Sequence, residues 1–122
     1  MDVEQLKNLV LEALTDVKGR DIVAIDVRGV SGVTDYMVVC SGTSNRHVKS
    51  LADNTWVEAK KKGIVPIGME GQETGDWVLV DFGDVVVHVM LPEARLFYDL
   101  ERLWQVPEPG SEPGSEPGSD AS

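Results

Sequence analysis

The chain has 122 residues, which is enough for one domain with a hydrophobic core, and it carries a formal net charge of −10. Four of its 21 acidic residues lie in positions 106–122, and the remaining 17 still outnumber the 11 lysines and arginines. This balance argues against a sequence-independent nucleic-acid binder, which needs Lys and Arg to neutralise phosphates. We expect no direct sequence-specific nucleic-acid partner either.

Cysteine usage and targeting patterns both favour a cytoplasmic protein. The single cysteine, Cys40, lies in an apolar run and cannot form an internal disulfide, so a reducing compartment is the simplest interpretation. Nothing in the sequence places His47 or His88 beside it, which disfavours a nucleophilic role. The sequence has no run of 18 apolar residues and no secretory or transit pattern, so we expect no membrane partner.

The first predicted element is an amphipathic helix over residues 2–18. Asp2 followed by Gln5 forms a capping-box pattern at its start, and Gly19 is expected to stop it. Its apolar stripe consists of Val3, Leu6, Leu9, Val10, Ala13, Leu14 and Val17. This pattern indicates a packing role.

Two strands are predicted next, over Ile22–Val27 and Tyr36–Cys40. The second is almost continuously apolar and is therefore expected in the centre of a sheet. The turn that follows, Ser41–Ser44, could bind an anion at the start of the next helix. Because it lacks the lysine of a phosphate loop, the favoured interpretation is that Thr43 or Ser44 caps the helix.

A second helix is predicted over residues 45–62, with Gly63 as its stop and Lys60–Lys62 placed favourably for the helix dipole. Its buried stripe consists of Val48, Leu51, Ala52, Thr55, Trp56 and Ala59. A short strand, Val65–Met69, follows, and Pro66 places it at an edge of the sheet.

A β-hairpin is predicted from Trp77–Asp81 and Val85–Met90, turned at Phe82–Asp84. With a connection of two or four residues, one face is a wholly apolar core face made of Val78, Val80, Phe82, Val85, Val87 and Val89. The other face then carries Trp77, Leu79 and Asp81 beside Val86, His88 and Met90. A three-residue connection would change these partners.

This second hairpin face is apolar, yet it holds an Asp and a His that a core would not select. From Gly63 to Ala94 the chain has six acidic residues and no Lys or Arg. Such a surface suits a basic protein partner. The alternative is that a helix covers this face and the acids are simply solvated, and spacing alone does not separate the two.

A third helix is predicted from Pro92 to about Trp104, with Leu96, Phe97, Leu100, Leu103 and Trp104 on one face. Tyr98 points the other way and is a candidate contact residue, or it packs on a neighbouring loop. After Pro107 the chain repeats Glu-Pro-Gly-Ser three times, and these repeats contain no hydrophobic residue, which predicts disorder. We therefore expect one α/β domain over 1–105, with a mixed five-stranded sheet flanked by helices, and a disordered acidic tail over 106–122.

Three blocks of the sequence, Thr34–Asp53, Gly68–Met90 and Glu93–Trp104, resemble the bacterial ribosomal silencing factor family, also called the Iojap family. The resemblance covers residues 2 to about 105. Trp56 stands where a smaller aliphatic residue is expected, and the acidic tail lies outside the family pattern.

The resemblance implies a nucleotidyltransferase-like fold without catalysis or a cofactor. It also implies binding to the large ribosomal subunit through the basic large-subunit ribosomal protein fourteen. Bound there, such a protein blocks joining of the small subunit and lowers translation when nutrients are short. We expect Trp77, Leu79 and Met90 to be apolar anchors, with Glu70, Asp76, Asp81 and Asp84 facing basic side chains. Tyr98 and His88 are weaker candidates.

Three alternatives stay open. A metal-dependent nucleotide-transfer enzyme would use Gly42–Ser44 with Asp81 and Asp84, but these acids are three positions apart across a turn, which disfavours convergence on a metal. An assembly factor for the large subunit would share the same surface. A homodimer of the free protein through that surface would compete with ribosome binding.

Overall fold

The computed structural model describes residues 2–30 and 32–98, with side chains described as far as Leu96. The elements in chain order are α1 (Val3–Asp16), β1 (Arg20–Asp26), β2 (Tyr36–Ser41), α2 (Asn45–Lys61), β3 (Gly68–Glu70), β4 (Trp77–Asp81), β5 (Val85–Met90) and α3 (Pro92–Tyr98). The five strands form one sheet in the order β1-β2-β5-β4-β3. β2 and β5 pair in parallel and the other neighbours are antiparallel, which confirms the predicted mixed five-stranded α/β fold.

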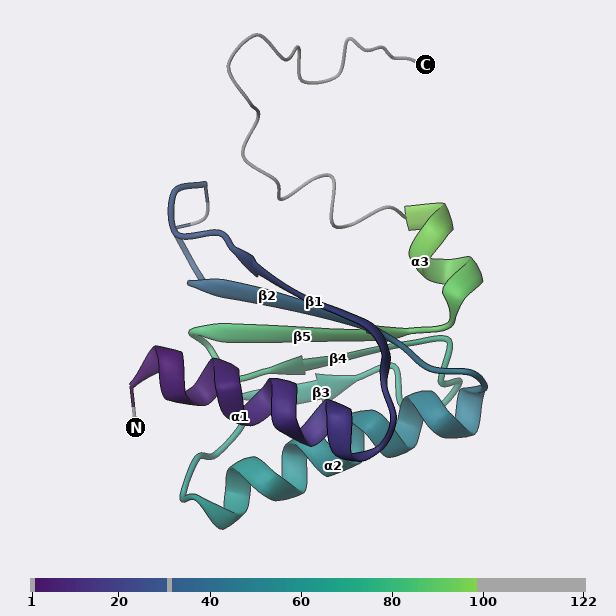
Figure 1. The fold of residues 1–122 in the computed structure, drawn as a ribbon, viewed down its shortest axis with the longest axis horizontal. Coiled ribbons are helices and arrows are strands. Elements are labelled where there is room, and N and C mark those ends of the chain that lie inside the picture. Colours follow the sequence, from purple (N-terminus) through teal and green to yellow (C-terminus); the bar gives the residue numbers. More distant parts are fainter. Residues whose placement is uncertain (1, 31, 99–122) are drawn as a thin grey trace, which may run out of the picture.

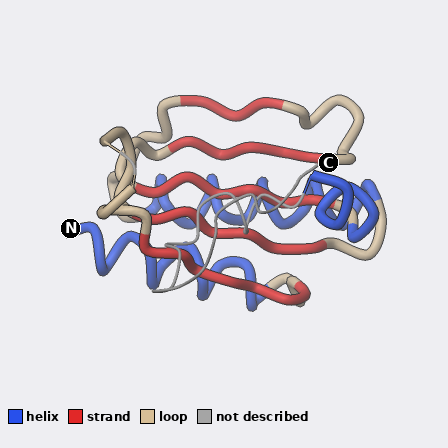
Figure 2. Tube along the Cα trace, turned by 90° about the horizontal axis from the view of Figure 1, so that it is seen from above, coloured by secondary structure: helices blue, strands red, loops and turns tan. Residues whose placement is uncertain are grey.

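The helices are divided unequally between the two faces of the sheet. Helices α1 and α2 lie together along one face, here called the inner face, and α3 lies on the opposite side at one end of the sheet (Figure 1). The view from above shows α1 and α2 behind the strands and α3 in front of their end (Figure 2). The face opposite α1 and α2 is called the outer face below.

The hydrophobic core fills the space between the inner face and the two long helices. Apolar stripes at helical spacing bury themselves against alternate strand residues, and this burial is the main driving force for the fold. The sheet contributes Val38, Cys40, Val78, Val80, Val85, Val87 and Val89, and the helices contribute Leu6, Val10, Leu14, Val48, Leu51, Ala52 and Ala59, all buried.

The residue that turns the chain at the end of α1 is not the predicted one. The capping box between Asp2 and Gln5 is present at its start. At the other end, Lys18 takes the positive φ, 63°, that Gly19 was expected to supply. Gly19 is needed for space instead, because a Cβ there would lie 2.5 Å from Sγ of Cys40.

The largest differences between predicted and observed strand boundaries are in β3 and β1. The third strand is Gly68–Glu70, shorter than the predicted Val65–Met69, because Pro66 has no N–H to donate to a ladder. Among the described residues it pairs only with β4, so its predicted edge position is confirmed. The first strand starts at Arg20, and an irregularity in its pairing lies between Arg20 and Val23.

Candidate partner-binding surface

The β4–β5 hairpin has a two-residue connection. The Phe82 N–H donates to the Val85 carbonyl oxygen over 3.0 Å, which leaves Gly83 and Asp84 as the loop. Gly83 has φ of 89°, a conformation that favours glycine. The resulting register pairs Trp77 with Met90, Leu79 with His88 and Asp81 with Val86, as predicted.

The two faces of the hairpin divide as the register requires. All six inner-face residues are buried, which confirms the predicted core face. On the outer face Trp77, Leu79, Asp81, Val86 and His88 are each partly exposed.

Met90 is the exception on the outer face, and the expectation that it is an exposed anchor is wrong. It is 0% exposed and packs in a small cluster with Val27, Met37 and Val39. Met90 therefore supports the surface from beneath. The cause is its position at the end of β5, where the chain enters α3 and Ala94 packs against this cluster.

Helix α3 reaches only one end of the outer face. Arg95 donates from Nη1 to Oγ of Ser41 over 2.9 Å, which fixes the start of α3 at the end of β2. The alternative interpretation of the sequence was that a helix covers the outer face of the hairpin. In the part of the chain that the structure describes, a helix covers this face only at that end (Figure 1). Tyr98 ends α3, and its side chain lies outside the described part of the chain.

Trp77 and His88 form a pair across β4 and β5. The indole Nε1–H of Trp77 donates to Nδ1 of His88 over 2.9 Å, and the ring centroids are 5.8 Å apart with 47° between their planes. Because Nδ1 accepts this bond, the neutral ring carries its proton on Nε2. Burial lowers the pKa of His88 to about 4, so His88 is uncharged at neutral pH.

The predicted acidic residues occupy different positions around this pair. Glu70 is exposed at the end of β3, and Asp84 is exposed in the hairpin loop. Oδ1 of Asp81 accepts from the Gly83 N–H over 2.8 Å, which orients this carboxylate beside the turn. Asp76 is turned toward α2, where its Oδ1 accepts from Nδ2 of Asn45 over 2.6 Å.

Two hollows lie on the outer face and meet at His88. The smaller, about 240 Å³, is lined by Glu70, Gly71, Trp77, Leu79 and His88. The larger, about 410 Å³, is lined by Val33, Thr34, Met37, Ile67, Asp81, Gly83, Val86 and His88. The structure thus brings together five of the nine predicted site residues, Glu70, Trp77, Leu79, Asp81 and His88. Asp76 and Asp84 lie outside both hollows.

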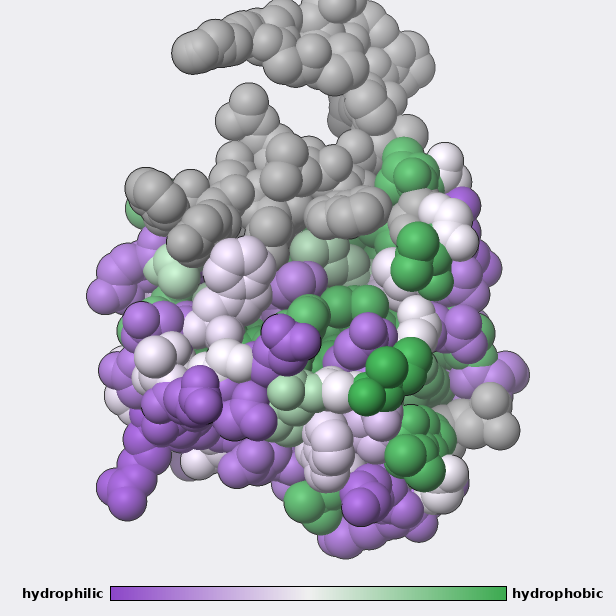
Figure 3. Space-filling model, turned by 180° about the vertical axis from the view of Figure 1, so that it is seen from behind, coloured by the Kyte–Doolittle hydropathy of each residue, from purple (hydrophilic) through white to green (hydrophobic). Residues whose placement is uncertain are grey.

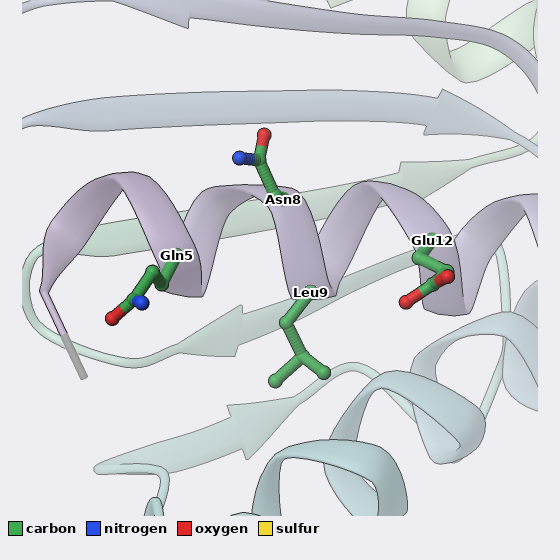
Figure 4. Close-up of a pocket in the computed structure, with 4 residues that line it drawn as sticks. All are labelled: Gln5, Asn8, Leu9 and Glu12. Atoms are coloured by element: carbon green, nitrogen blue, oxygen red, sulfur yellow. The ribbon is translucent and has the colours of Figure 1, made fainter.

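A third hollow, about 420 Å³, contains none of the predicted site residues. Its lining consists of Gln5, Asn8, Leu9 and Glu12, which all belong to α1 (Figure 4). Residues at this spacing share one side of a helix, and three of the four are polar.

The turn between β2 and α2 is a helix cap, as the favoured interpretation predicted. Oγ of Ser44 accepts from the His47 N–H over 3.1 Å, and the Gly42 N–H donates to the Met90 carbonyl oxygen over 3.0 Å. The Thr43 N–H donates to Nδ1 of His47 over 2.9 Å. These N–H groups are engaged within the protein, which removes the basis for an anion site built from them.

The residues that the structure describes include no group of three or more His, Cys, Asp or Glu side chains that could hold a metal ion. In the described part of the chain, no helix has both the length and the apolar character needed to cross a membrane.

The sequence of the chain matches a known protein family. The family described as "Ribosomal silencing factor during starvation" matches residues 1–120. The chain belongs to this family, which is a family of ribosome-associated regulators of translation.

Individual relatives agree with this assignment. A ribosomal silencing factor from Chromobacterium violaceum is 47% identical over 109 residues, covering 89% of each chain. A crystal structure of a protein from the same organism superimposes with a TM-score of 0.85 at 45% identity, covering 93% of this chain and 98% of the other. A mouse protein named for mitochondrial assembly of the ribosomal large subunit is 38% identical over 106 residues, covering 84% of this chain and 45% of its own length.

Proposed function

We propose that this chain binds the large ribosomal subunit through large-subunit ribosomal protein fourteen and sterically blocks joining of the small subunit. The effect is lower translation when nutrients are limited. Binding alone produces this effect, so the proposal includes no catalytic step and no cofactor. Its setting is the cytoplasm.

The observation that carries the proposal is the outer face of the β4–β5 hairpin. Trp77 and Leu79 are partly exposed there beside Glu70 and Asp81, within a stretch, 63–94, that contains no Lys or Arg. An apolar centre with acidic neighbours complements a basic protein surface. Met90 supports this surface from within. Asp76, Asp84 and Tyr98 remain proposed contacts at its margins.

Co-sedimentation tests this function directly. The full chain is mixed with purified large subunits, and small subunits are then added. We expect the protein to travel with the large subunit and to reduce the fraction of joined ribosomes. A chain that stays in the supernatant at all concentrations contradicts the proposal. Crosslinking to ribosomal protein fourteen, compared between the wild type and Trp77→Ala, tests the named contact.

A second candidate, assistance in assembling the large subunit, is favoured by the name of the mouse relative. Both functions would use the same surface. Binding to the large subunit with no effect on joining supports assembly. If the free protein is a homodimer that uses this face, we expect the dimer to dissociate when large subunits are added.

A further inference from the structure

The larger hollow forms an apolar trough on the outer face beside the hairpin turn. We define the apolar trough by four residues, Val33, Ile67, Asp81 and Val86. Val86 on β5 forms part of its floor, and Val33 and Ile67 come from two different loops at its sides. In the view from behind, hydrophobic side chains gather along one side of the molecule, among hydrophilic neighbours (Figure 3).

The two side residues of the trough are unusually exposed for aliphatic residues. Val33 is 88% exposed and Ile67 is 71% exposed. One such residue on a surface needs no explanation, but two at the sides of an apolar hollow indicate a contact site. Because both are already in contact with water, replacing either with a polar residue should leave the fold intact.

The position of Ile67 is fixed by the hairpin. Its N–H donates to the Asp81 carbonyl oxygen over 2.7 Å. Its Cδ1 lies 3.2 Å from the point that a Cβ on Gly83 would occupy, so the side chain rests against the turn. A preformed side of this kind loses little side-chain entropy when a partner binds.

Charge distinguishes the kind of partner that fits the trough. Asp81 lies at its edge, with its carboxylate oriented by the Gly83 N–H. Glu70 is the acidic residue that lines the neighbouring hollow, together with Trp77 and Leu79. Successive outer-face residues on β5, such as Val86 and His88, are roughly 7 Å apart. The two hollows therefore form one continuous surface, with an apolar floor and a carboxylate in each half.

We propose that the apolar trough receives an aliphatic or aromatic side chain of a basic protein partner, flanked by a Lys or Arg that pairs with Asp81. This inference rests on the proposed function, since the partner is the protein surface that the Trp77 hollow binds. It adds a second contact point, separate from Trp77, and makes the interface two neighbouring apolar hollows with one acid each.

The test compares the double variant Val33→Ser/Ile67→Ser with the control Val57→Ser, using the full chain and purified large subunits. Val57 is also an exposed aliphatic residue, at 46%, but it lies on α2 on the other side of the sheet. We expect the double variant to bind roughly tenfold more weakly and the control to stay within about twofold of the wild type. Unchanged melting temperatures would show that all three fold alike.

A second variant tests the charge. Asp81→Asn should weaken binding and also reduce its dependence on salt concentration, because one ion pair is lost. The double variant should keep the salt dependence of the wild type. The difference in salt dependence between the two variants separates the apolar contact from the charged one.

The outcomes distinguish this inference from the proposed function. If the double variant binds large subunits with the same affinity as the wild type, the proposed role of the trough is wrong and the proposed function stands. No binding by the wild type overturns both. A wild-type dimer that the double variant dissociates, with large-subunit binding unchanged, overturns the inference by showing that the trough binds a second copy of the chain.

Discussion

Nε2 of His47 lies 2.7 Å from the carbonyl oxygen of Val17, so a ring on the first turn of α2 bonds to the end of α1. Since Nδ1 of the same ring accepts from the Thr43 N–H, Nε2 carries the proton and donates to Val17. One imidazole thus joins the C-terminal cap of α1 to the turn that starts α2.

This relationship predicts a stability loss for His47→Ala. The substitution leaves the Val17 carbonyl and the Thr43 N–H without this partner, which should cost about 1–2 kcal/mol of unfolding free energy. Chemical denaturation measures it. Arg46→Ala is the control, because Arg46 is exposed on the same turn. Equal stability of the two variants would contradict the role assigned to His47.

The Trp77–His88 pair predicts a pH dependence of stability. The pKa of His88 is about 4 in the folded protein against 6.5 as its ordinary value, so the unfolded chain takes up the proton more readily. The unfolding free energy should therefore decrease as the pH falls from 6.5 toward 4, and this contribution is fully present above 6.5.

The variant His88→Gln isolates that contribution. Glutamine cannot titrate but can still accept from the Trp77 indole, so the variant should lose stability less steeply over the same pH range. Carboxylates titrate in both proteins and cancel in the difference between the two curves. Parallel curves between pH 6.5 and 4 would mean that His88 is not the group responsible.

Binding energy should depend strongly on Trp77. As a partly buried aromatic residue at the centre of the proposed interface, it should contribute roughly 2 kcal/mol or more to large-subunit binding when truncated to Ala. Titration with purified large subunits measures the loss. Wild-type affinity in a folded Trp77→Ala protein would place the interface elsewhere on the molecule.

Gly71 should be intolerant of substitution. Its φ is 89°, and a Cβ there would lie 2.1 Å from the carbonyl oxygen of Trp77. Gly71→Ala should therefore cost about 2 kcal/mol or more in stability. Gly29→Ala is the matched control, because an added Cβ at Gly29 meets nothing within 4 Å. Similar melting temperatures for both variants would rule out the close approach.

Deleting Pro107–Ser122 should leave the melting temperature unchanged. These residues lie outside the described part of the chain, and the expectation follows from their sequence, which contains no group able to join a hydrophobic core except one alanine. Thermal unfolding of residues 1–106 beside the full chain tests it. A fall of many degrees would show that the domain extends into the tail.

Local patterns were sufficient to predict most of the fold. The hairpin bounds, its register and the capping box were correct because each depends on residues close together in the sequence. The burial of Met90 could not be predicted in this way, because it follows from packing with Val27 and Val39 on other strands. Likewise, no local signal connects His47 to Val17, which lies 30 positions earlier.

The parallel pairing of β2 with β5 has a consequence for how the binding surface behaves in the free protein. Residues such as Val38 and Val87, which come from distant parts of the chain, are direct neighbours in the sheet. Closing such a contact is slow in folding, but once formed it makes β5 part of the central cooperative unit. We therefore expect His88 and its neighbours on β5 to stand on backbone that opens only when the sheet unfolds. A partner meets a rigid surface, and little of the binding energy is spent on ordering it.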